Sequence, residues 1–82
     1  MVEMWVLLLF LDGTLKEYAG HTENANGEWG EMGMSGCLRM RRTLKRNGLA
    51  DTASGRTRVT CESRTVELKT NREGKIVVAK VL

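Results

Sequence analysis

The feature that most constrains this chain is an apolar segment that ends in a tight-turn signal. Residues 4–11 read Met-Trp-Val-Leu-Leu-Leu-Phe-Leu, and Asp12-Gly13 follows directly. The Asp-Gly pair readily adopts the left-handed backbone of a two-residue hairpin turn. We therefore predict a β-hairpin over residues 4–19. Its first strand is apolar on both faces, which predicts a central strand, because such a strand is covered on both sides.

The length of the chain limits its organisation. At 82 residues it forms one domain at most, residues 1–82, and such a small domain buries only about 60% of its unfolded surface. The apolar run of eight residues is short beside the roughly 20 that a membrane helix needs. Glu3 occupies the place where a signal peptide carries positive charge. We expect no membrane segment and a cytoplasmic location.

A glycine-rich segment separates this hairpin from the strongest helix pattern. Glycines recur at every third position from Gly27 to Gly36, without proline, so we predict a flexible loop over 20–35. A helix is expected over 36–47, with Ser35 as its N-cap and Asn47-Gly48 as its stop.

The predicted helix is amphipathic and basic. Cys37, Met40 and Leu44 share one face at helical spacing. The rest of the surface carries the bases Arg39, Arg41, Arg42, Lys45 and Arg46. This basic surface predicts contact with nucleic-acid phosphates or with an acidic partner, and the alternative is a solvated outer face.

Two further strands complete the predicted fold. We expect a polar loop over 49–56, then strands over 57–70 and 75–82. The apolar positions of the first of these change phase near Ser63-Arg64, which predicts a bulge or a break. The fold class is α+β, in the order β-β-α-β-β, with the basic helix packed on an antiparallel sheet.

The last strand is apolar in both phases, so it is either central in the sheet or part of a dimer interface. The residues that would form this interface are Ile76, Val78 and Val81.

The two cysteines leave two interpretations open. Cys37 and Cys61 are 24 positions apart, which does not fit a zinc site. They are either buried thiols or a disulfide that joins the helix to a strand.

A weak family resemblance accompanies these patterns. The opening Met-Trp-Val-Leu of residues 4–7, a glycine turn, Cys37-Leu-Arg-Met-Arg-Arg at the start of the basic helix, and Val-Thr-Cys-Glu at residues 59–62 resemble small uncharacterised proteins of bacterial viruses, mobile elements and marine metagenomes. The resemblance covers the chain apart from the glycine-rich loop. It implies a β-β-α-β fold with a Cys–Cys link, and it implies no activity.

Catalytic motifs are incomplete. The run Phe10-Leu-Asp-Gly-Thr-Leu resembles the first motif of haloacid-dehalogenase phosphatases, but Phe10 replaces the nucleophilic aspartate. His21 is the only histidine and lies in a polar segment. We therefore expect no enzyme activity, no catalytic or metal site, no cofactor and no small-molecule substrate.

The net charge of +3 conceals an asymmetry. Residues 1–36 carry one base and six acids, a net charge of −5, whereas residues 37–82 carry 12 bases and four acids, a net charge of +8. Two opposed charged surfaces suit closure on each other or on a partner. The sequence thus predicts a small accessory protein that contacts a protein partner or a second copy of itself. The alternative is a nucleic-acid-binding module that uses the basic helix.

Overall fold

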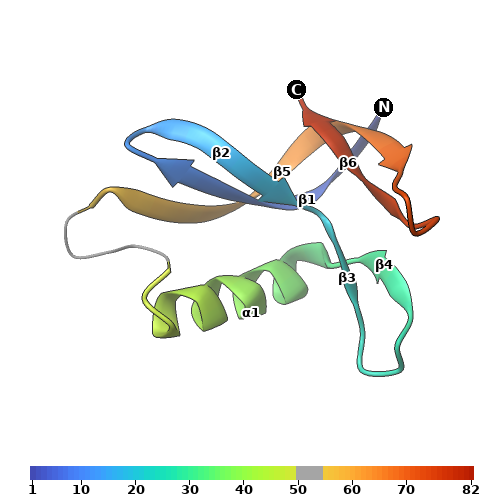
Figure 1. The fold of residues 1–82 in the computed structure, drawn as a ribbon, viewed down its shortest axis with the longest axis horizontal. Helices are drawn as coiled ribbons and strands as arrows, with labels where there is room; N and C mark the ends of the chain where they lie inside the picture. The colour runs from blue at the N-terminus through green and yellow to red at the C-terminus, as the bar shows by residue number, and fades with distance from the viewer. Residues whose placement is uncertain (50–54) are drawn as a thin grey trace.

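A computed structural model describes residues 1–49 and 55–82 of the chain (Figure 1). Its elements are β1 (Val2–Leu11), β2 (Thr14–Ala19), β3 (His21–Glu23), β4 (Trp29–Glu31), α1 (Gly33–Arg46), β5 (Thr57–Thr70) and β6 (Ile76–Val81). Four strands form an antiparallel sheet in the order β2-β1-β5-β6, and β3 pairs with β4 in a separate two-stranded sheet. The α+β class is confirmed, but the predicted order β-β-α-β-β lacks β3 and β4. Most of the loop predicted at 49–56 lies outside the described residues.

The Asp-Gly turn closes the first hairpin as predicted. Asp12 and Gly13 both have positive φ, 52° and 82°, as a type I′ turn requires. The register then shifts within β2, where Lys16 is an extra residue between the pairs Phe10–Leu15 and Leu9–Glu17. The shift places Tyr18 opposite Leu8.

Both faces of β1 are covered, so it is a central strand. On one face Leu7 packs with Val59 of β5 and with Cys37 of α1. On the opposite, concave face a second cluster consists of Met4, Val6, Leu8, Val66 and Val78. The two clusters alternate along β1 because successive side chains of a strand point to opposite faces.

The phase change of the apolar residues in β5 also arises because the two faces of the sheet are buried at different places. The predicted bulge or break near Ser63-Arg64 is wrong, since β5 is continuous and its register with β1 runs without a shift from Val66 to Thr57. Val59 belongs to the cluster under α1, whereas Val66 belongs to the concave cluster. Each part of the strand is therefore buried on a different face.

The sheet curls until its two edge strands approach each other (Figure 1). β6 carries an extra residue, Ala79, between its pairs with Glu67 and Leu68, and such bulges strengthen the local twist. The Tyr18 hydroxyl of β2 donates a 2.6 Å hydrogen bond to the Ala79 carbonyl of β6. This bond joins the two edges of the curled sheet.

The segment predicted as a flexible loop is an ordered hairpin. Residues 20–35 contain β3, β4 and the start of α1, and the Asn24 side chain accepts hydrogen bonds from the backbone N–H groups of Asn26 and Glu28 in the connecting turn. The Met32 N–H donates to the Gly20 carbonyl and ties the base of the hairpin. Figure 1 shows this hairpin beyond the N-terminal end of α1.

The helix starts earlier than predicted. It spans Gly33–Arg46, so Ser35 lies inside the first turn, and Met32 occupies the N-cap without a side-chain cap hydrogen bond. The predicted stop is present, because Gly48 has a φ of 74° and its N–H bonds back to the Lys45 carbonyl. No helix among the described residues has the length and apolar character to cross a bilayer.

The two cysteines meet between α1 and β5. Cys37 is fully buried, and the sulfur atoms of Cys37 and Cys61 lie at disulfide distance with their Cα atoms 6.0 Å apart. This separation is typical of a bonded pair. The structure thus favours the disulfide over two separate thiols.

Candidate functional site

The predicted basic surface of α1 is divided by the structure. Arg39, Arg42, Lys45 and Arg46 are exposed. Arg41 instead is half-buried, and its Nε donates a 2.8 Å hydrogen bond to the Val59 carbonyl of β5. At 100° per residue, Arg39, Arg42 and Arg46 fall within about 60° of one another and opposite Cys37. They form an outward stripe that extends about 10 Å along the helix, from the 1.5 Å rise per residue.

Two other bases near the helix in sequence lie elsewhere. Arg56 forms an exposed ion pair with Asp12 at 3.1 Å, and the pKa of Arg56 is raised by this hydrogen-bonded carboxylate, with slight burial acting in the opposite direction. Arg58 alternates with the α1-facing Val59, so it projects from the opposite side of the sheet. Neither base extends the stripe.

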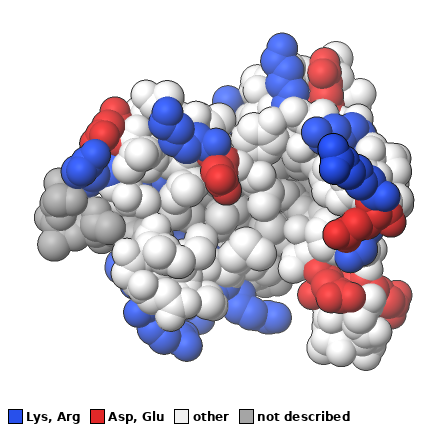
Figure 2. Space-filling model, in the orientation of Figure 1, with Lys and Arg blue, Asp and Glu red and all other residues white. Residues whose placement is uncertain are grey.

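The acidic segment, which is the β3–β4 hairpin, lies at the N-terminal end of α1 (Figure 1). Glu23, Glu28 and Glu31 of the β3–β4 hairpin line a groove of about 530 Å³ together with Arg39 of α1. Within residues 1–49 and 55–82, no ion pair joins these glutamates to Arg39. Figure 2 shows basic side chains at the lower left, where α1 lies, and acidic ones at the lower right, where the hairpin lies. The acidic and basic surfaces therefore border one groove at Arg39, but no ion pair joins them there among the described residues.

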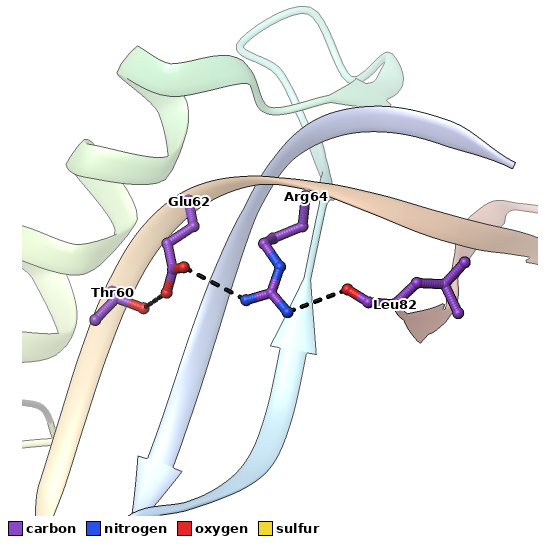
Figure 3. Close-up of polar contacts among 4 residues, drawn as sticks. All are labelled: Thr60, Glu62, Arg64 and Leu82. Atoms are coloured by element: carbon purple, nitrogen blue, oxygen red, sulfur yellow. Dashed lines mark hydrogen bonds and ion pairs between the residues drawn. The ribbon is translucent and has the colours of Figure 1, made fainter.

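A row of polar side chains follows β5 on the concave face (Figure 3). The Glu62 carboxylate accepts a 2.8 Å hydrogen bond from the Thr60 hydroxyl. It also forms an ion pair with Arg64, whose Nη1 lies 3.4 Å from Oε1. Arg64 Nη2 donates to the Leu82 carbonyl at 3.1 Å. These groups bind one another and fasten residue 82 to β5, which indicates a structural role.

An apolar opening lies between the β3–β4 hairpin and β6. It measures about 700 Å³, and we call it the Trp29 groove. Four large apolar side chains that are exposed in this protein line it, with exposed fractions of 43% for Val2, 37% for Trp29, 40% for Leu68 and 51% for Ile76. Glu3, Glu31, His21 and Lys75 complete its wall.

The indole of Trp29 is fixed in this groove by three contacts. Its Nε1 donates a 2.7 Å hydrogen bond to the Ile76 carbonyl. The Lys75 ammonium lies 4.9 Å from the ring centroid, within the range of a cation–π interaction. The His21 ring stacks beside the indole at a centroid distance of 6.3 Å and an interplanar angle of 12°. The aromatic side chain is therefore held in place before any partner arrives.

His21 has an unsatisfied ring nitrogen. Its Nδ1 is buried and has no hydrogen-bond partner among the described residues. His21 lies opposite Glu31 in the β3–β4 pair. No group of three or more His, Cys, Asp or Glu side chains in the described parts of the chain is arranged to hold a metal ion.

The strand predicted as an interface exposes less apolar surface than its sequence suggests. Val78 is only 7% exposed and belongs to the concave core, and Val81 packs against the same cluster. Ile76 alone presents its side chain to solvent, and it does so in the Trp29 groove. Trp29, Leu68 and Lys75 were not predicted as site residues, although an isolated tryptophan in a polar, glycine-rich segment was a usable signal.

Comparison of the chain with protein-family models, curated proteins and solved structures gives no match.

Proposed function

We propose that this protein is a non-enzymatic binding protein that contacts a protein partner through the Trp29 groove. The observation that carries the proposal is the convergence of four exposed, large apolar side chains on one opening. Single exposed apolar residues are ordinary, whereas large contiguous apolar patches mark interaction sites. Tryptophan is also enriched among the residues that dominate binding energy at interfaces.

The fixed position of Trp29 supports the same function. Ordering a flexible side chain on binding costs about 0.5–1.5 kcal/mol. The hydrogen bond to Ile76 and the Lys75 contact already order the indole. Folding has therefore already ordered the indole, so a partner that binds it does not incur this free-energy cost.

Affinity capture with matched variants tests this proposal. The wild-type protein and Leu15→Asp are expected to retain the same partner from a lysate, whereas Ile76→Asp is expected to lose it. Leu15 is a suitable control because it is 37% exposed on β2 and lies outside the groove. The retained protein is then purified and titrated against all three proteins. A partner that binds Ile76→Asp as tightly as wild type would place the interface elsewhere.

Nucleic-acid binding by α1 is the second candidate. The supporting observation is the outward stripe of Arg39, Arg42 and Arg46, flanked by exposed Lys45, on a helix that contains no acidic residue. Four phosphate contacts would give a salt dependence of log K on log salt of at most about −3.6 on duplex DNA. Arg42→Ala and Arg46→Ala should each reduce this slope by about 0.9. The control Lys80→Ala removes an exposed base of β6, and binding without salt dependence would refute this candidate.

From the resemblance of the sequence alone, we also propose an accessory role in a bacterial virus or other mobile element. The genes that neighbour this one would test that role.

A further inference from the structure

We infer that the occupant of the Trp29 groove is a segment of a separate protein that inserts an aliphatic side chain beside Trp29 and places a lysine or arginine at Glu31. This inference rests on the proposed function and specifies the chemistry of the partner.

The first step concerns how a partner can dock. An exposed sheet edge commonly binds a peptide as an added strand, through its free backbone groups. In β6, however, the Ile76 carbonyl accepts from Trp29 Nε1, and the Ala79 carbonyl accepts from the Tyr18 hydroxyl. The side chains of Tyr18 and Trp29 therefore occupy two carbonyl groups of β6, which leaves fewer acceptors for an added strand. This favours a partner that docks through its side chains.

The second step concerns the floor of the groove. Leu68 lies two residues from buried Val66, and Ile76 lies two residues from buried Val78. Alternation places each pair on one face, so the floor is an uncovered continuation of the concave core. Such a surface matches an aliphatic side chain, which continues the packing of the core without leaving a polar group unpaired.

The third step concerns charge. Lys75 is the cation of the groove wall, and it already contacts Glu73 at 3.5 Å and the Trp29 ring. Glu3 accepts a 3.3 Å hydrogen bond from the Ser63 hydroxyl. Glu31 is exposed, and no ion pair engages it within residues 1–49 and 55–82. The uncompensated charge of the wall is thus negative, and a cation next to the inserted side chain complements it.

A pair of fluorescent peptides tests this chemistry. The first has the sequence of residues 33–46 with Cys37→Ser, which combines apolar residues with five bases and has no acid. The second has the same sequence with every base replaced by glutamate. Fluorescence anisotropy measures the binding of each peptide to the intact protein.

The expected results are specific. The basic peptide should bind wild type at least tenfold more tightly than the acidic peptide, and Ile76→Asp or Leu68→Asp should weaken it at least tenfold. Glu31→Lys should reverse the preference between the two peptides, while Leu15→Asp should leave it unchanged. Circular dichroism spectra that match wild type show that the variants are folded.

Three outcomes would overturn the inference. Equal binding of the two peptides would refute the charge requirement. Unchanged binding to both floor variants would refute side-chain insertion. A concentration-dependent dimer that Ile76→Asp abolishes in sedimentation equilibrium would assign the groove to a second copy of the chain. If affinity capture still yields a partner that depends on Ile76 while the peptides show no charge preference, the proposed function stands and only the partner chemistry is wrong.

Discussion

Gly20 is the glycine at which an added methyl group would make the closest contacts. It is buried at the junction of β2 and β3, and an added Cβ would lie 2.6 Å from Met4 Cε, 2.9 Å from Val78 Cγ2 and 3.3 Å from Val6 Cγ1. Met4 can move the end of its flexible chain, but the β-branched Val78 has little rotamer freedom. Overpacking of this kind costs about 1–3 kcal/mol. For a domain of this size, Gly20→Ala should lower the melting temperature by about 4–24 °C.

Gly30 offers a matched control for this substitution. It lies in β4 of the same hairpin, its φ is not positive, and an added Cβ would meet no atom within 4 Å. Gly30→Ala should raise stability by about 0.4–1 kcal/mol, because it restricts the unfolded chain without strain in the folded one. The comparison therefore separates the steric effect at Gly20 from the general effect of replacing glycine.

Thermal and urea denaturation of the two variants give the required free energies. The double variant Gly20→Ala/Val78→Ala should be more stable than the sum of the single effects predicts, by about 1 kcal/mol, because the second change removes the clashing methyl group. If Gly20→Ala is as stable as wild type, or if the effects in the double variant are strictly additive, a side chain at residue 20 does not clash with Val78.

Three further predictions concern the contacts that hold the sheet and the helix. Reduction of a Cys37–Cys61 bond should increase the intact mass by about 2 Da, which is two hydrogen atoms. It should also lower the free energy of unfolding by about 3 kcal/mol. Complete thiol labelling of the unfolded, unreduced chain would show that no bond exists. Tyr18→Phe should lower the stability by about 0.5–1.5 kcal/mol in urea denaturation, since it removes the bond to the β6 carbonyl, and an unchanged midpoint would mean that this bond does not hold the curl. Asp12→Asn should leave the melting temperature unchanged, because asparagine keeps the left-handed turn and the ion pair with Arg56 is exposed; a large decrease would show that the ion pair stabilises the hairpin.

The sequence was informative where one segment determined its own structure. The Asp-Gly hairpin, the strand at 57–70 and the stop at Gly48 follow from local turn and propensity signals, and the structure contains all three. The β3–β4 hairpin was missed because strands of three residues contain barely more than one alternation of side chains. The phase change in β5 was misinterpreted as a bulge or a break because a strand buried on different faces along its length loses its simple alternation.

The Trp29 groove could not be predicted for a different physical reason. Val2, Trp29, Leu68 and Ile76 belong to four separate strands. They meet only because the sheet curls and the hairpin folds beside β6. The side chain of Ile76 was identified from the apolar pattern of its strand, but that pattern does not distinguish an exposed position from a buried one such as Val78.

The same indole serves the fold and the proposed binding surface. Trp29 occupies a β6 carbonyl that would otherwise be available to another strand, and its ring forms a wall of the groove. Loss of the indole should therefore expose the β6 edge and remove the binding surface at once, so a binding defect in Trp29→Ala would not separate the two roles. Ile76→Asp does separate them, because its backbone carbonyl still accepts from Trp29 while its side chain no longer offers an apolar contact. A partner lost with Ile76→Asp, from a protein that remains folded and keeps the oligomeric state of the wild type, would identify the groove itself as the binding surface.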